Sequence, residues 1–137
     1  GICFGLPGVL KAQGNMLLLP SGLYLKYDDL QYIQGEKGLE FTYKVRRGRN
    51  RIYGGKIIEN VCQAIARCII GEQMLKIAKR YRVVLTVHDS IVCCVEDNES
   101  EKARKFIEES MRWTPDWAKG LPIDCESGIG KSYGGCE

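Results

Sequence analysis

The sequence lacks several features that would assign it to a familiar class. It has one histidine, and its seven cysteines show no C-x-x-C spacing, so a tetrahedral zinc site is not expected. No apolar stretch approaches the roughly 20 residues of a membrane span, and the first residues lack the charged-then-apolar order of a signal peptide. We therefore expect a soluble, cytoplasmic protein whose cysteines are reduced thiols.

Composition and charge exclude further classes. The chain has 137 residues, of which 45% are hydrophobic and 27% charged, as in an ordinary folded domain and unlike a disordered chain. A net charge of +3 does not indicate a general polyanion-binding tail, although Arg46, Arg47, Arg49 and Arg51 form a local basic cluster. Repeats, low-complexity tracts and linkers are absent, so residues 1–137 are expected to form a single folded unit.

The first half of the chain predicts antiparallel β structure. Residues 1–15 are rich in glycine and show no periodicity, which predicts a loop or a frayed end. Pro20-Ser21-Gly22 suits a turn with a positive φ at its third position, and residues 28–38 are expected to form a polar connector with glycines. The expected strands are residues 16–19, residues 23–27, residues 39–45 and the stretch at Ile52 and Tyr53.

The second half predicts two helices around a hairpin. Apolar residues recur at helical spacing from Lys56 to about Arg80, which indicates a long helix with a broad apolar face; they are Ile57, Ile58, Val61, Ile65, Cys68, Ile69 and Leu75. Residues 99–113 predict a second amphipathic helix, capped by Asn98, with Ala103, Phe106, Ile107 and Met111 facing inward. Trp113 and Trp117 are expected to complete the core. Residues 121–126 are expected to form a short strand. The predicted fold class is α+β: an antiparallel sheet with a long central helix and a second, C-terminal helix packed on it.

Between the two helices, Val83–Val95 sets two polar residues between two apolar runs. Runs rich in Val, Ile and Thr predict buried strands. The break at His88-Asp89-Ser90 is short enough for a tight antiparallel hairpin with the pair at its tip. The local pattern leaves two interpretations open. The tip is either a solvated turn, where Asp and Ser are common, or a functional pair presented on a rigid base.

A stripe of polar residues marks one side of the long helix. At about 100° per residue, Lys56, Asn60, Gln63 and Arg67 fall within about 60° of one another, and we call these four residues the polar stripe. Glu59 lies at its edge. Such a stripe is either a solvated face or a surface for a ligand that combines hydrogen-bond acceptors with negative charge, as nucleic acid does.

Four separated motifs resemble, in order and spacing, the C-terminal part of family A DNA polymerases, and most closely the phage-encoded members. They are Leu19–Gly22, Tyr53–Arg67, Val87–Asp89, and Trp117–Pro122 followed by Tyr133-Gly134. The resemblance runs from about Leu17 onward. It implies the later part of the palm subdomain, an antiparallel sheet backed by helices, in an enzyme of DNA replication.

The resemblance also implies roles for the candidate residues. Asp89 matches the Asp that binds the two catalytic Mg²⁺ ions, His88 a histidine near the primer terminus, and Gln63 a glutamine that contacts the duplex in the minor groove. The rest of the polar stripe is expected to join Gln63 in binding DNA. The residue types suit the chemistry, because hard divalent cations prefer carboxylate oxygen and phosphoryl transfer is catalysed mostly by positioning and charge. The implied partners are primer–template DNA and deoxynucleoside triphosphates, with no membrane.

Two departures from the family pattern qualify this expectation. Ser90 follows Asp89 where the family commonly has Glu. The motifs Asp-Tyr-Ser-x-x-Glu and Arg-x3-Lys-x7-Tyr-Gly, which carry the family's other metal-binding Asp and its fingers helix, do not occur. We therefore expect a palm fragment that is inactive without a complementary segment. One alternative is a non-catalytic nucleic-acid-binding or structural palm remnant. Another, a hydrolase dyad of His88 and Asp89, is disfavoured because adjacent strand residues point to opposite faces.

Overall fold

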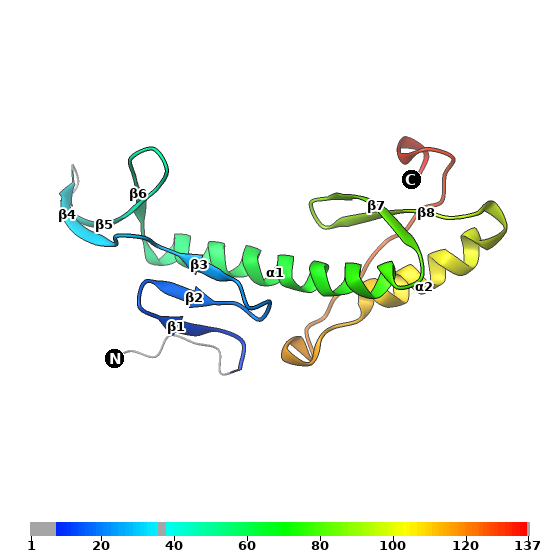
Figure 1. Cartoon of the computed structure of the whole chain (residues 1–137), viewed down its shortest axis with the longest axis horizontal. Coiled ribbons are helices and arrows are strands. Elements are labelled where there is room, and N and C mark those ends of the chain that lie inside the picture. The colour runs from blue at the N-terminus through cyan, green and yellow to red at the C-terminus, as the bar shows by residue number, and fades with distance from the viewer. Residues whose placement is uncertain (1–7, 36–37, 137) are drawn as a thin grey trace. The chain divides into compact units, whose positions relative to one another are not determined.

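The computed structural model describes residues 8–35 and 38–136. Internal contacts group the chain into two compact units, Gly1–Cys68 and Ile69–Glu137, with the boundary inside helix α1 (Gly54–Ala78) (Figure 1). One helix thus belongs to both units, and the single folded unit stays a prediction. Among the described residues, no helix combines the length and the apolar character needed to cross a membrane.

The N-terminal unit holds two antiparallel sheets, as expected for this half. Their strand orders are β1-β2-β3 and β4-β5-β6. The first sheet consists of β1 (Lys11–Gln13), β2 (Met16–Leu18) and β3 (Tyr24–Lys26), and the second of β4 (Gln31–Gly35), β5 (Gly38–Lys44) and β6 (Arg49–Ile52). The turn between β2 and β3 is confirmed, because Gly22 has a φ of 81° and its N–H donates to the Leu19 carbonyl at 2.9 Å.

Two assignments in this half were wrong. Strand β1 lies in the stretch expected to be a loop; the loop prediction for residues 1–7 falls outside the described residues. Gln13 pairs with Met16 across the two-residue turn Gly14-Asn15, and Gly14 has a φ of 57°. A Gly followed by Asn is a recognised signal for such a turn. Strand β4 replaces the expected polar connector, because Tyr32 and Ile33 favour a strand more than the flanking polar residues oppose it.

A small core connects β5 and β6 with the start of α1. Tyr27 and Ile52 are buried, and the Tyr27 ring meets Tyr43 edge-on with centroids 5.3 Å apart. The Tyr27 hydroxyl accepts a hydrogen bond from Asn60 Nδ2 at 3.1 Å. At Asn60, α1 is therefore in contact with the rest of the unit.

The apolar face predicted for α1 was wrong at two positions. Ile58 and Leu75 are 58% and 64% exposed. Ile58 lies about 160° around the helix from Asn60, and Leu75 about 160° from the fully buried Ile77. Both side chains therefore point away from the groups that α1 packs against.

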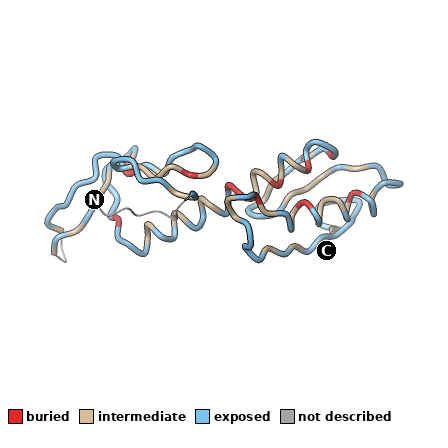
Figure 2. Tube along the Cα trace, turned by 90° about the horizontal axis from the view of Figure 1, so that it is seen from below, coloured by how far each residue is buried: buried red, intermediate tan, exposed pale blue. Residues whose placement is uncertain are grey.

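The C-terminal unit packs a hairpin and a helix against the end of α1. The hairpin consists of β7 (Arg82–Val87) and β8 (Ser90–Cys94), and helix α2 covers Ser100–Arg112. The core cluster consists of Ile77, Tyr81 and Ala103, with Val83, Ile91, Cys93, Val95, Phe106, Ile107 and Met111 packed against it. Figure 2 shows buried residues along the helices of this unit. The α+β fold class and the inward face predicted for α2 are confirmed.

Three predictions in this unit were wrong. Asn98 is not the cap of α2, because it lies in a 3-10 turn (Asp97–Glu99) that precedes the helix and makes no capping hydrogen bond. Trp113 is 38% exposed rather than buried in the core. Residues 121–126 form no strand, since none of the strands that the structure describes pairs with them. Two more 3-10 turns cover Asp116–Ala118 and Tyr133–Gly135.

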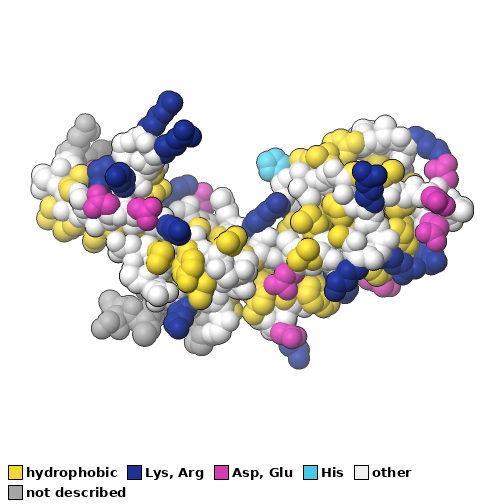
Figure 3. Space-filling model, viewed as in Figure 1, with side chains coloured by type: hydrophobic (Ala, Val, Ile, Leu, Met, Phe, Trp, Pro, Cys, Tyr) yellow, Lys and Arg dark blue, Asp and Glu magenta, His cyan; other side chains and the backbone are white. Residues whose placement is uncertain are grey.

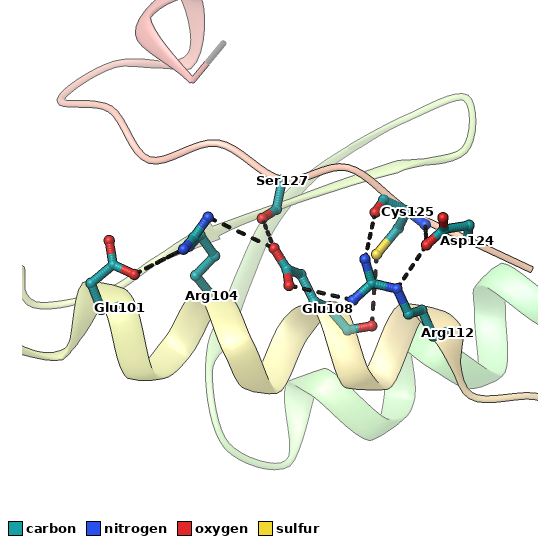
Figure 4. A network of polar contacts seen from close by, with 7 residues as sticks. All are labelled: Glu101, Arg104, Glu108, Arg112, Asp124, Cys125 and Ser127. Atoms are coloured by element: carbon teal, nitrogen blue, oxygen red, sulfur yellow. Dashed lines mark hydrogen bonds and ion pairs between the residues drawn. The ribbon is translucent and has the colours of Figure 1, made fainter.

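The chain after α2 is tied to that helix by polar contacts (Figure 4). Arg112 Nε lies 2.7 Å from Asp124 Oδ1, and Arg112 Nη2 donates to the Cys125 carbonyl at 3.0 Å. Ser127 Oγ donates to Glu108. The hydrogen bond from Arg112 holds the pKa of Asp124 below its ordinary value of 3.8, and the one from Ser127 lowers the pKa of Glu108. Side-chain contacts with α2 therefore take the place of the expected strand pairing.

Candidate functional site

The β7–β8 hairpin places His88 and Asp89 in its two-residue turn. Val87 pairs with Ser90, so these two residues alone connect the strands. Turns of this length need a positive φ at the first central residue, and His88 has a φ of 53°. Few non-glycine residues adopt that conformation, although His is enriched there. The predicted tight hairpin with the pair at its tip is confirmed.

The base of the hairpin is anchored in the core. Val83, Ile91 and Cys93 pack against the cluster of Ile77, Tyr81 and Ala103. Burial also raises the pKa of the Cys93 thiol above its ordinary value of 9.0, so Cys93 stays neutral and apolar. The tip is therefore held on a packed base rather than on a free loop.

Both tip side chains are open to solvent. His88 and Asp89 are exposed, and neither side chain makes a hydrogen bond or an ion pair with any other residue that the structure describes. The oxygens of the Asp89 carboxyl group are consequently open to an external cation or donor. An exposed tip agrees with both interpretations of the sequence pattern.

The donor set does not fit a two-metal site formed by this chain alone. Within residues 8–35 and 38–136, no group of three or more His, Cys, Asp or Glu side chains could hold a metal ion. Two divalent cations need several carboxylate oxygens, and Asp89 is followed by Ser90. The Mg²⁺ pair predicted from the family resemblance would need carboxylates from another segment.

Glu59 links two members of the polar stripe. Its carboxylate lies 2.8 Å from Lys56 Nζ, and its Oε1 accepts a weaker hydrogen bond from Gln63 Nε2 at 3.4 Å. The contact with Glu59 raises the pKa of Lys56 above its ordinary 10.5. Because its charge is paired, Lys56 offers less to a phosphate than an unpaired lysine would. Sequence reasoning placed Glu59 at the edge of the stripe and missed this contact.

The remaining members of the polar stripe differ in how accessible their side chains are to a ligand. Asn60 is half-buried and holds Tyr27, as described above. Gln63 and Arg67 are exposed, and Arg67 has no ion-pair partner among the described residues. A ligand approaching this part of α1 would therefore meet the Gln63 amide and the Arg67 guanidinium first.

An exposed aromatic pair on β4 and β5 was missed by sequence reasoning, because β4 was assigned to a connector. Tyr32 pairs directly with Phe41, and the ring centroids are 4.5 Å apart with an interplanar angle of 32°. The two residues are 56% and 48% exposed. The available signal was the alternation of apolar and polar residues along β5, together with Tyr32 and Ile33 in β4.

Comparison with known proteins relates the chain to a phage enzyme. It is 32% identical over 125 residues to a DNA polymerase of Bacillus phage SP02, in an alignment that covers 84% of this chain and 19% of the phage protein. The chain thus spans about a fifth of the length of this relative. No protein-family profile matches the sequence, and no solved structure matches it.

The sequence relationship therefore extends over most of this chain, and it is to a DNA polymerase. The family A subtype, the palm assignment and the roles of the site residues stay predictions.

Proposed function

We propose that the chain is the C-terminal palm portion of a family A DNA-directed DNA polymerase and that Asp89 is one of its catalytic carboxylates. The supporting observation is the position of Asp89. It lies exposed, with no hydrogen bond or ion pair to any residue that the structure describes, at the tip of a core-anchored hairpin, in a chain related to a phage DNA polymerase. A nucleotidyl-transfer site needs an uncompensated carboxylate on a rigid support, because catalysis depends on positioning and charge.

The proposed site is completed by another polypeptide segment. That segment supplies the second metal-binding Asp and the fingers residues that hold the deoxynucleoside triphosphate, and Mg²⁺ is the cofactor of the assembled site. His88 lies beside Asp89 in the turn. Its ring nitrogens place the primer end by hydrogen bonds, and it transfers no proton.

The polar stripe is the proposed duplex contact. The exposed Gln63 amide can donate to minor-groove acceptors that all base pairs share, so it can check pair geometry without reading sequence. Arg67 contacts a phosphate, which fixes the position of the duplex. Lys56 and Asn60 take part through their contacts with Glu59 and Tyr27, which orient this side of α1.

A non-catalytic palm remnant is the alternative function. The single carboxylate at the hairpin tip favours it, since Ser90 stands where the family commonly has Glu. In that case the chain would bind nucleic acid or support another polypeptide without contributing to synthesis.

A chimera separates the two functions. This chain would replace the matching fifth of the Bacillus phage SP02 polymerase, and primer extension with Mg²⁺ would be compared with that of the isolated chain. We expect templated extension by the chimera and none by the isolated chain, because the two-metal mechanism needs a second carboxylate and a nucleotide site. A folded chimera that binds primer–template but does not extend it would support the remnant, and extension by the isolated chain would contradict the fragment interpretation.

A further inference from the structure

The sheet β4-β5-β6 has aromatic side chains that remain exposed, with no other residue that the structure describes packed over them. Alternation along β5 places Leu39, Phe41 and Tyr43 on one face, and Tyr32 lies opposite Phe41 on β4. The part of this face nearest to α1 is covered, because Tyr43 packs against Tyr27. Leu39, Phe41 and Tyr32 remain between 48% and 59% exposed.

We propose that this face binds single-stranded DNA, with bases stacked on Tyr32 and Phe41 and phosphates held by Arg46 and Arg47. The two rings are already in contact and are held by paired strands, so a base can stack on them without ordering a flexible loop. Stacking of this kind tolerates any sequence, because every base has a π face.

The arginines of the β5–β6 loop supply the charge. Two other arginines of the basic cluster, Arg49 and Arg51, lie on β6 and are paired with Asp29 and Glu40. Arg46 and Arg47 are exposed and have no acidic partner among the described residues. Figure 3 shows Lys and Arg side chains projecting from this loop. Arg46 lies in the loop, two residues after β5 ends at Lys44, so it is at most about 18 Å from Phe41, and one short strand of DNA can reach both.

The distribution of charge along the sequence agrees with a polyanionic partner for this unit. Residues 1–68 contain ten Lys and Arg against five Asp and Glu, and residues 69–137 contain ten against twelve. The net positive charge of the chain therefore belongs to the N-terminal unit, although the total of +3 is small. A local excess of this sign attracts phosphate.

Single-stranded DNA fits this surface better than duplex, because duplex bases are stacked and paired and offer no free π face. The choice of DNA over RNA rests on the proposed function, in which an unpaired template strand is present. The surface itself does not depend on Asp89 or on the complementary segment.

The test is fluorescence anisotropy of a labelled oligo-dT with the full chain, without magnesium. Tyr32→Ala and Phe41→Ala should each weaken binding roughly 5- to 100-fold. Arg46→Ala combined with Arg47→Ala should reduce the slope of log affinity against log salt by about 1.4, since each phosphate contact to a single strand contributes about 0.7. Leu23→Ala, which changes an exposed side chain in the loop between β2 and β3, should bind like the wild type. Far-UV circular dichroism would establish that each variant is folded.

Several results would overturn the proposal. They are unchanged affinity in folded Tyr32 and Phe41 variants, tighter binding of a duplex of equal length, and tighter binding of oligo-rU than of oligo-dT. A loss of self-association on Phe41→Ala, seen by sedimentation, with DNA affinity unchanged, would instead assign the face to a second copy of the chain. Asp89→Asn should bind oligo-dT normally, so failure of this proposal and failure of the polymerase function are distinguishable.

Discussion

Gln73→Ala should destabilise the C-terminal unit strongly. The Gln73 side chain is fully buried, and its Nε2 donates to the carbonyls of Met111 and Trp113 at 2.6 and 2.9 Å. These carbonyls lie at the C-terminal end of α2, where helix carbonyls have no partner within the helix. One amide on α1 therefore satisfies the end of a second helix.

The magnitude follows from these contacts. Each hydrogen bond contributes about 0.5–1.5 kcal/mol net, and a buried acceptor left without a partner costs about 1–3 kcal/mol. Together these ranges give an expected loss of about 2–4 kcal/mol in the free energy of unfolding. This corresponds to a fall in Tm of roughly 6–20 °C. The chain has two tryptophans, Trp113 and Trp117, and both belong to this unit, so intrinsic fluorescence during urea unfolding follows it selectively.

Matched substitutions test the cause of this loss. Gln73→Met keeps the volume and removes both the donors and the buried Oε1, which has no partner in the described structure. It should therefore be less destabilising than Gln73→Ala by about 1 kcal/mol or more. Gln73→Glu presents only acceptors to two carbonyls and should be the least stable at neutral pH. The reasoning is refuted if the free energy of unfolding of Gln73→Ala stays within about 0.5 kcal/mol of that of the wild type, or if Gln73→Glu is as stable as the wild type.

Three further predictions concern the tail, the turn and the duplex contact. Acid should loosen the chain after α2. Arg112 lowers the pKa of Asp124 below 3.8 in the folded state. The stabilisation that the Asp124–Arg112 contact gives to the tail is therefore present above about pH 4 and is lost as the pH falls through the lowered pKa. Amide exchange of the tail should show this dependence, and Asp124→Asn should remove it. His88→Val should cost about 1–2 kcal/mol, because a β-branched residue is strained at a φ of 53°, whereas His88→Gly should stay within about 1 kcal/mol of the wild type in the same urea assay. Gln63→Ala should weaken primer extension by the chimera at limiting DNA while leaving its stability intact, and an equal loss in the exposed control Gln13→Ala would contradict the assignment.

Local patterns predicted the hairpin tip and the inward face of α2. The sequence His88-Asp89 between β-branched runs sets both the strands and the length of the turn. The helical spacing of Ala103, Phe106 and Met111 defines a single face that meets one core. These features depend on near neighbours in the chain, which a sequence displays directly.

Features that depend on distant partners were not predictable in the same way. Residues 121–126 favour a strand by composition but pair with none of the strands that the structure describes, and contacts from Arg112 hold them instead. Glu59 joins two members of the polar stripe because of the side-chain conformations that bring them together, and spacing along a helix does not specify these. The exposure of Leu75 depends on which side of α1 the rest of the unit covers. Such facts are set by tertiary packing rather than by local propensity.

The most direct test of the central claim is primer extension by the chimera carrying Asp89→Asn. This change removes the carboxylate charge with almost no change of shape. Asp116→Asn, another exposed aspartate of the same unit, is the matched control. If Asp89 is a metal ligand, extension should fall by more than about 100-fold, since even residues that only support a metal ligand cost 10–100-fold when changed. Primer–template affinity should remain, and the Asp116→Asn chimera should extend normally. Extension by the Asp89→Asn chimera at the wild-type rate would contradict the assignment of Asp89 and with it the proposed catalytic role of this chain.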